Sequence, residues 1–320
     1  MVVTVGTRFF MEVPVFTFSL PDFSYAFLSV LLEGMPFILV GTLISGLLDQ
    51  FLPSKVMLRF LPKNPFLGAC TAAGMGLIFP MCECGVVPVI RRLIHKGLPV
   101  SNAVAYMLAA PVVNPIVILS TYAAFRGQGA LEMSSLRVAV AFLVAVLVAM
   151  AVHNLPLRRV LRPRILESVE NLPDGELHTH YHPIGLLRRL RAALHVAVSD
   201  FLDVMVYFVL GVGVSAAIST ALNQEVLLPL ALNDWFATAA MMLLAFVLSL
   251  CSTSDAFIAA TFVAFPAVAK LAFLVFGPML DLKLVFIYSS VFTKRFILGL
   301  AVGLFVLIGL ICVRLSVIGL

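Results

Sequence analysis

Charged residues are scarce in this chain of 320 residues: Asp, Glu, Lys and Arg together make up 12% of it, whereas hydrophobic residues make up 62%. Soluble proteins contain about 25% charged residues, so the composition excludes a soluble enzyme and a disordered chain. Apolar stretches of roughly 20 residues recur from Phe23 to Val317, and each is long enough to span a bilayer as a helix. The alternating apolar and polar strands of an outer-membrane barrel are missing. We therefore predict an all-α polytopic protein embedded in a lipid bilayer.

Motifs for energy-driven or hydrolytic chemistry are also missing. The sequence has no phosphate-binding loop and no nucleophile elbow, so we predict neither an ATP-driven pump nor an enzyme, and no bound cofactor. The net charge of +5 is spread over short loops and one central segment without interleaved aromatic residues, so nucleic acid is not an expected partner. The five cysteines lie in or beside apolar stretches and are predicted to be reduced thiols: Cys70, Cys82, Cys84, Cys251 and Cys312.

The apolar stretches predict about eight transmembrane helices. Their approximate ranges are 23–50, 65–90, 99–125, 136–155, 195–222, 235–260, 270–292 and 296–318. Four parts follow from them: an N-terminal interfacial segment (1–22), membrane repeat 1 (23–155), a loop (156–194) and membrane repeat 2 (195–320).

The long polar stretch between the fourth and fifth spans sets the expected orientation. It runs from His153 to Arg191 and holds seven of the 21 Lys and Arg residues, so the positive-inside rule makes this loop cytoplasmic. We expect a multi-pass protein of the cytoplasmic (plasma) membrane. In a cell that has two membranes, this is the inner membrane. Eight crossings would put both termini on the side of this loop, with Lys55, Arg59 and Lys63 on the other.

The two halves of the chain resemble each other in register. A shift of 170 residues aligns 32–35 with 202–205, a shift of 169 aligns Cys82 with Cys251, and a shift of 167 aligns 111–114 with 278–281. We interpret this as an internal repeat of four helices per half, which is typical of transporters. Four crossings per half would make the repeats parallel. If 86–96 is instead one arm of a re-entrant hairpin, the count becomes odd and the repeats are inverted.

Helix-breaking residues fall inside the second and third spans of each half. In the first half they are Pro80 to Gly85 and Pro111 to Pro115, and proline interrupts helical hydrogen bonding. Counted from the turn near Gly97, the two breaks reach similar depth and should face each other. The same construction recurs around Cys251 and Asp281. Because non-helical backbone inside a membrane survives only in protein or beside a wet cavity, these breaks predict a transport site at mid-membrane.

The residue types at the breaks suggest the chemistry of this site. Two thiols flank a carboxylate in Cys82-Glu83-Cys84, and Cys251 opens the corresponding segment. Thiolates bind soft centres, so Cys82, Cys84 and Cys251 are also candidate metal ligands. The predicted substrate-binding residues are Cys82, Glu83, Cys84, Gly85, Pro111, Asn114, Cys251, Ser252, Thr253, Ser254, Asp255 and Asp281.

Other ionisable residues receive separate predictions. Glu33 and Asp203 are related by the repeat offset and are candidates for proton coupling, because ionisable groups inside a bilayer are costly. Lys283, near a span end, is expected to extend its amine to the membrane interface. The alternating histidines at 178, 180 and 182 suggest metal sensing only weakly, and a solvated loop is the favoured interpretation of His178, His180 and His182.

The segment 82–88, followed by 91–97 and 109–115, resembles the predicted-permease family that includes YraQ-like proteins and ArsP. The segment 251–256 looks like the second motif of that family, and the resemblance covers roughly residues 24–318. ArsP-type members export trivalent organoarsenicals, so the resemblance implies a permease with a small-molecule or metalloid substrate. The family typically has a small residue between its two cysteines, whereas this chain has Glu83.

The chemistry and the resemblance together favour a secondary transporter that exports a small thiophilic species, such as trivalent (organo)arsenicals, by alternating access around the Cys-x-Cys site. Two alternatives stay open. The chain could be a permease for another small solute, with structural or redox-regulatory cysteines. It could also be a membrane thiol redox protein in which Cys82 and Cys84 cycle through a disulfide.

Overall fold

A computed structural model describes residues 19–51, 62, 64–170, 186–221 and 234–318. In this part of the chain the secondary structure is helical, with one isolated β-bridge between Leu161 and Phe292. The elements in chain order are α1 (Leu20–Phe51), α3 (Pro65–Gly74), η1 (Met75–Leu77), α4 (Val86–His95), α5 (Val100–Ala109), α6 (Pro115–Ala124), α7 (Ala130–His153), α8 (Leu157–Val160), α9 (Pro163–Glu170), α10 (Leu186–Ala221), α11 (Asp234–Leu248), α12 (Asp255–Thr261), α13 (Ala267–Met279), α14 (Leu282–Tyr288) and α15 (Lys294–Ile318).

Five of the described helical stretches are long and apolar enough to span a membrane: α1, α7, α10, α13 with α14, and α15. Shorter apolar helices fill the space between them, among them α3, α5, α6 and α11. Leucine and other large apolar side chains remain exposed along α1, α10 and α15, as expected for surfaces that face lipid. The prediction of an all-α polytopic membrane protein is confirmed.

Each predicted helix break is present. Non-helical backbone separates η1 from α4, α5 from α6, α11 from α12, and α13 from α14. After the second and fourth of these breaks, a side chain restarts the helix. The Asn114 Oδ1 atom accepts a hydrogen bond from the Ile116 N–H at 2.9 Å, and the Asp281 Oδ1 atom accepts one from the Leu284 N–H at 2.7 Å. Such N-caps satisfy donors that the first helical turn leaves unpaired.

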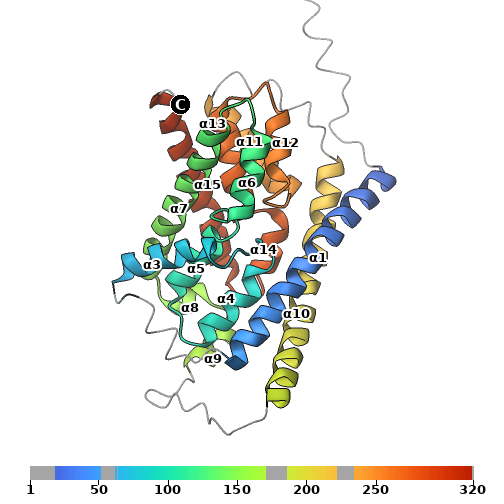
Figure 1. The fold of residues 1–320 in the computed structure, drawn as a ribbon, viewed down its shortest axis with the longest axis vertical. Helices are drawn as coiled ribbons and strands as arrows, with labels where there is room; N and C mark the ends of the chain where they lie inside the picture. The colour runs from blue at the N-terminus through green and yellow to red at the C-terminus, as the bar shows by residue number, and fades with distance from the viewer. Residues whose placement is uncertain (1–18, 52–61, 63, 171–185, 222–233, 319–320) are drawn as a thin grey trace, which may run out of the picture.

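The first broken segment turns back instead of crossing the molecule. Helix α4 runs beside α1 in the same direction, because Gly85 contacts Gly41 and the Lys96 Nζ atom donates to the Asp49 carbonyl oxygen at 2.7 Å. Helix α3 and η1 run parallel to α5, because Gly68 packs against Asn102 and Gly76 packs against Ala110. In Figure 1, α3 lies crosswise at mid-height at the side of the molecule, and α4 leads down toward the lower end, the end that carries α8 and α9, so the stretch 65–95 does not reach the upper end.

The second broken segment turns back at the opposite, upper end. Helix α11 descends from this end, α12 returns to it, and α13 starts there (Figure 1). Helix α15 is antiparallel to α13, because Leu271 shares a pocket with Leu315 whereas the Phe276 ring contacts the Phe305 ring edge to face. Three stretches in each half thus run from end to end: α1, α5 with α6, and α7, then α10, α13 with α14, and α15.

This arrangement places the end of the C-terminal helix on a different side than eight straight crossings would. Three crossings separate the lower end at α8 and α9 from the end of α15, so the C-terminal helix ends at the upper end (Figure 1). Eight crossings would have put both termini beside the central loop. The predicted places of residues 1–18, of Lys55, Arg59 and Lys63, and of the three loop histidines lie outside the described residues.

Helices α1 and α10 form an antiparallel pair beside the other helices. Small residues allow this close approach, since Gly34 packs against the ring of Phe208 and Gly46 against the Ala193 carbonyl oxygen. The buried core lies on the other side of the breaks, where α5 and α13 have almost every residue buried. The breaks are therefore enclosed between the α1–α10 pair and the core.

Candidate functional site

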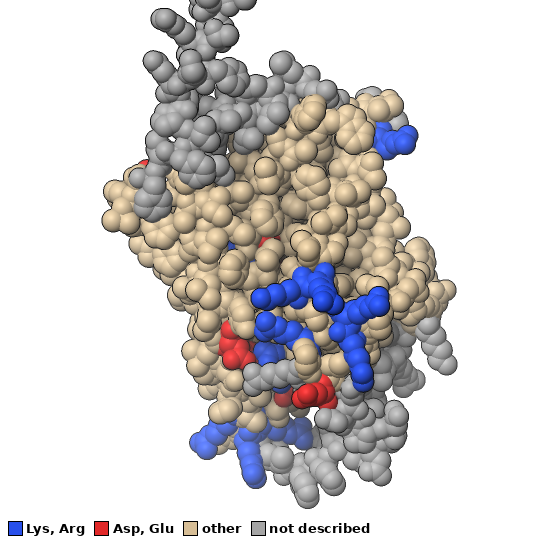
Figure 2. Space-filling view, turned by 180° about the vertical axis from the view of Figure 1, so that it is seen from behind, with Lys and Arg blue, Asp and Glu red and all other residues tan. Residues whose placement is uncertain are grey.

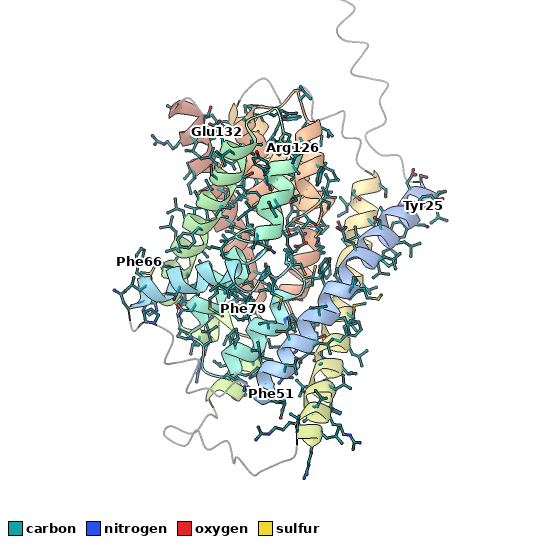
Figure 3. All side chains as sticks on the ribbon, viewed as in Figure 1. Tyr25, Phe51, Phe66, Phe79, Arg126 and Glu132 are labelled. Atoms are coloured by element: carbon teal, nitrogen blue, oxygen red, sulfur yellow. The ribbon has the colours of Figure 1, made fainter. Side chains whose placement is uncertain are left out.

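One narrow pocket lies where the first and third breaks meet the α1–α10 pair. Figure 3 places Phe79, at the start of the first break, between the levels of Phe51 at the lower end and Arg126 at the upper end. The residues that line the pocket come from both halves of the chain: Val30, Glu33, Gly34, Phe37, Cys82, Glu83, Cys84, Phe208, Cys251 and Lys283.

The three cysteines singled out in the sequence share this pocket. Cys84 and Cys251 are buried and Cys82 is half-buried, and all three are free thiols. The Cys82 Sγ atom accepts a hydrogen bond from the Gly85 N–H at 3.2 Å, which holds the tight turn into α4. Within the described ranges, no three His, Cys, Asp or Glu side chains are placed to hold a metal ion. The candidate metal ligands Cys82, Cys84 and Cys251 therefore share the pocket without forming such a group.

A buried charge network adjoins the thiols. Glu83 is 2% exposed; its Oε1 atom lies 3.3 Å from the Lys283 Nζ atom, and its Oε2 atom accepts a hydrogen bond from the Ser252 hydroxyl at 3.2 Å. The Lys283 ammonium also donates to the Ser249 carbonyl oxygen at 2.8 Å and lies 3.2 Å from the Asp281 carboxylate. The expectation that Lys283 extends to the membrane interface is wrong, because this ammonium ties the first, third and fourth breaks together.

A second buried ion pair, between Arg137 and Asp255, stabilises the backbone of the third break. Arg137 of α7 donates to the Asp255 Oδ2 atom at 2.7 Å, to the Ser252 carbonyl oxygen at 3.2 Å and to the Thr121 hydroxyl at 2.7 Å. Asp255 therefore pairs with Arg137, which holds the Ser252 backbone, and does not itself line the pocket. Arg137 is not among the predicted site residues, although a lone arginine in an apolar stretch is itself a signal of a buried partner.

Several predicted site residues serve the scaffold around the pocket. Asn114 caps α6, and Pro111 lies in the same break, which packs against η1 and does not line the pocket. Helix α5 contacts the start of the first break, because the Tyr106 hydroxyl donates to the Phe79 carbonyl oxygen at 3.2 Å. Gly85 packs against the backbone of α1, where a side chain would meet the Phe37 carbonyl oxygen.

Two hydroxyl groups of the third break contact residues that line the pocket. The Thr253 hydroxyl lies 3.5 Å from the Cys251 sulfur, and the Ser254 hydroxyl lies 3.5 Å from the Glu33 Oε1 atom. Glu33 lines the pocket, whereas Asp203, the other candidate for proton coupling, is exposed and pairs with Arg91 at 3.3 Å nearer the lower end. The structure therefore places only the first of the two proton-coupling candidates at the site.

An ionic cluster closes the lower end below the pocket. Asp200 of α10 is 2% exposed and receives two hydrogen bonds from Arg92 of α4, both at 2.9 Å, and one from the Ser45 hydroxyl of α1 at 3.1 Å. Sequence reasoning missed this cluster, because its members come from three helices with no shared motif. It joins the α1–α10 pair to the re-entrant hairpin.

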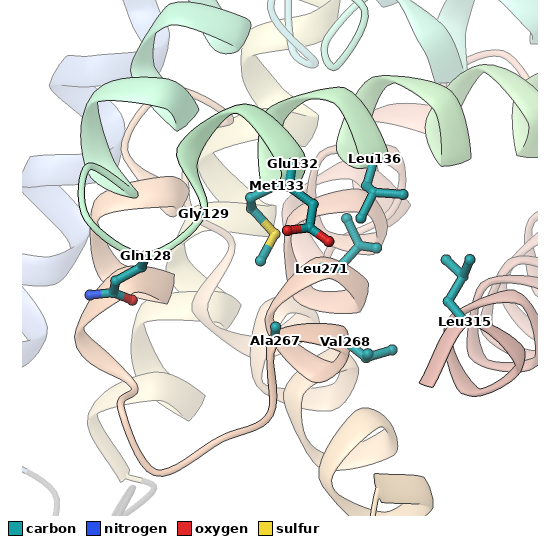
Figure 4. Close-up of a pocket in the computed structure, with 9 residues that line it drawn as sticks. All are labelled: Gln128, Gly129, Glu132, Met133, Leu136, Ala267, Val268, Leu271 and Leu315. Carbon is teal, nitrogen blue, oxygen red and sulfur yellow. The ribbon is translucent and has the colours of Figure 1, made fainter. Parts of the chain in front are cut away.

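A further pocket, at the upper end, lies between the start of α7, the start of α13 and the end of α15 (Figure 4). Its polar side chains are Gln128 and Glu132, and the rest of its lining is apolar. It contains no thiol and none of the predicted site residues. The pocket at the breaks remains the candidate site.

Comparison with known proteins decides the family. A family profile described as "Predicted permease" matches residues 20–317. The chain belongs to this predicted-permease family. The membrane permease is 38% identical to the UPF0718 protein YcgR of Bacillus subtilis over 274 residues, which cover 85% of this chain and 89% of that protein. It is 33% identical to a putative two-component membrane permease complex subunit of Streptococcus mutans over 273 residues, which cover 85% and 87%. No solved structure matches the permease.

Proposed function

We propose that this permease is a secondary transporter that exports a small thiophilic species, such as a trivalent inorganic or organic arsenical, by alternating access around Cys82, Cys84 and Cys251. The supporting observation is the single pocket in which these thiols from both halves of the chain face the α1–α10 pair. Soft centres such as trivalent arsenic favour sulfur ligands, and a small number of thiols permits release on the far side.

The proposal includes an inverted internal repeat of residues 23–155 and 195–320. Each half has three stretches that run from end to end and one hairpin that turns back, and the second arms of the two hairpins lead to opposite ends: α4 to the lower end and α12 to the upper end. Repeat-related residues also meet near the centre, since Cys82 and Cys251 share the pocket and Ser252 donates to Glu83. Such a repeat supports alternating access, because exchanging the conformations of the two halves moves the opening from one side to the other.

The lower end is proposed to face the cytoplasm. Figure 2 shows Lys and Arg side chains gathered over the lower half of the face turned away from the viewer in Figure 1. Exposed basic residues at this end include Arg158 and Arg159 of α8 and Lys294 and Arg295 at the start of α15. An excess of basic residues marks cytoplasmic segments, so the ionic cluster around Asp200 would close the cytoplasmic side in this conformation.

Uptake into everted membrane vesicles tests the cargo. We expect vesicles with wild-type protein to accumulate trivalent methylarsenic or arsenite, and Cys84→Ser to abolish the accumulation, because one ligand of the soft centre is lost. Cys312→Ser is the matched control, since Cys312 is buried in α15 and does not line the pocket. Unchanged uptake by a Cys82, Cys84 and Cys251 triple serine variant would contradict the proposal.

A permease for another small solute is a second candidate, favoured by one observation. Glu83 and Lys283 line the pocket beside the thiols, so a polar or charged solute would also find partners there. This candidate predicts transport that survives alkylation of the thiols. If the permease protects cells against arsenicals and this protection is lost when the thiols are alkylated, the second candidate is excluded.

A further inference from the structure

Asp281 carries a charge that its capping role does not require. Its Oδ1 atom caps α14, as the Asn114 Oδ1 atom caps α6 at the position 167 residues earlier. Asparagine and aspartate are equally good N-caps. The first half of the chain thus shows that an uncharged side chain is sufficient here, and the negative charge of Asp281 needs another explanation.

The second oxygen of Asp281 provides a starting point. Asp281 is 0% exposed, and its Oδ2 atom makes no hydrogen bond in the part of the chain that the structure describes. It lies 3.2 Å from the Lys283 Nζ atom. A shift of 167 residues aligns Lys283 with Ile116, so this ion pair belongs to the second half alone.

The charges around Lys283 do not balance. One ammonium is shared by two carboxylates, Glu83 at 3.3 Å and Asp281 at 3.2 Å, and each of the three residues is at most 2% exposed. Arg137, the other buried cation that contacts the third break, is already paired with Asp255. Among the described residues, the other titratable groups that interact with Asp281 or Lys283 are Cys84, Cys251 and Tyr288, none of which can supply a positive charge. A buried net charge of this kind is costly by several kcal/mol.

We propose that the Asp281 Oδ2 atom is the binding site of the exchangeable proton that couples this permease to a proton gradient. This inference deepens the proposed transport function and rests on it. When a proton from water on one side forms the O–H bond, the group of Glu83, Asp281 and Lys283 becomes neutral. When the pocket opens to the other side, water accepts the proton and the group returns to a charge of minus one.

Infrared spectroscopy of the full-length protein in lipid tests the proton without any cargo. At pH 7 the wild type should show the carbonyl-stretch band of a protonated carboxyl group, shifted on exchange into deuterated water. Asp281→Asn, which keeps the cap oxygen, should lose the band, whereas Asp22→Asn at the exposed start of α1 should keep it. A wild type without the band, or an Asp281→Asn variant that retains it, would overturn the proposal.

A second variant covers the case in which Asp281→Asn does not fold. Glu83→Gln leaves a neutral pair of Lys283 and Asp281, so no extra proton is needed and the band should again disappear. Persistence of the band in folded Glu83→Gln protein would equally overturn the proposal.

Vesicle uptake separates the proton site from the cargo. With trivalent methylarsenic as the probe, Asp281→Asn should reduce the ratio of uptake with and without a proton gradient to about one. A ratio that stays at the wild-type value would refute coupling through Asp281. If the wild type moves no arsenical, the cargo proposal fails, and the infrared band alone decides on the proton site.

Discussion

At the scale of single residues, the contact between Gly41 and Gly85 fixes how closely α1 approaches the first break. A Cβ atom at Gly41 would overlap the Gly85 carbonyl oxygen and lie 2.8 Å from the Gly85 Cα atom, so the backbone would have to move. We expect Gly41→Ala to destabilise the protein by about 1 to 3 kcal/mol, the usual effect of overpacking. The unfolding temperature of the variant in detergent, compared with that of the wild type, measures this loss of stability.

Gly303 of α15 is the matched control for this prediction. A Cβ atom there would meet nothing within 4 Å, so Gly303→Ala should be neutral or stabilising by about 0.4 to 1 kcal/mol. Equal unfolding temperatures for the two variants would show that the contact between α1 and the break is looser than the structure indicates.

At the scale of elements, the pair of Arg92 and Asp200 joins the re-entrant hairpin to α10. Arg92→Ala leaves the Asp200 carboxylate buried with only the Ser45 hydroxyl, and we expect a loss of about 3 to 5 kcal/mol. Arg91 is the matched control: its partner Asp203 has a side chain that is 53% exposed, so Arg91→Ala should cost at most about 1 kcal/mol.

Chemical unfolding of both alanine variants measures the difference between the neighbouring arginines. Adding Asp200→Asn to Arg92→Ala should recover part of the lost stability, because the unpaired charge is removed. Similar losses of unfolding free energy in Arg91→Ala and Arg92→Ala would mean that the Asp200 carboxylate is in contact with water.

At the scale of the whole molecule, the two re-entrant hairpins determine on which side the chain ends. We predict that a tag after Ile318 and a tag within residues 171–185 lie on opposite sides of the membrane, because three crossings separate them. Protease protection of the two tags in sealed vesicles checks this. Eight straight crossings would instead place both tags on the same side.

The sequence was sufficient for the helices and their breaks, because these depend on local properties. Length and apolar composition define the spans, and Pro80, Pro111 and Pro278 lie at or next to breaks. Whether the chain continues or turns back after a break depends on contacts between distant segments, such as Gly41 with Gly85. The same limit applies to the site: the thiol motifs are local, whereas the partner of Lys283 is 200 residues away.

Arg137 has a consequence for biogenesis. Its carboxylate partner, Asp255, is synthesised 118 residues later, and a ribosome adds about 5 to 20 residues each second, so the wait is roughly 6 to 24 s. During this time the arginine in α7 has no counter-ion, and α7 cannot settle in its final place. The first half of the permease therefore cannot mature before the second half leaves the ribosome, and a truncated chain ending in the central loop is expected to be a substrate for membrane proteases.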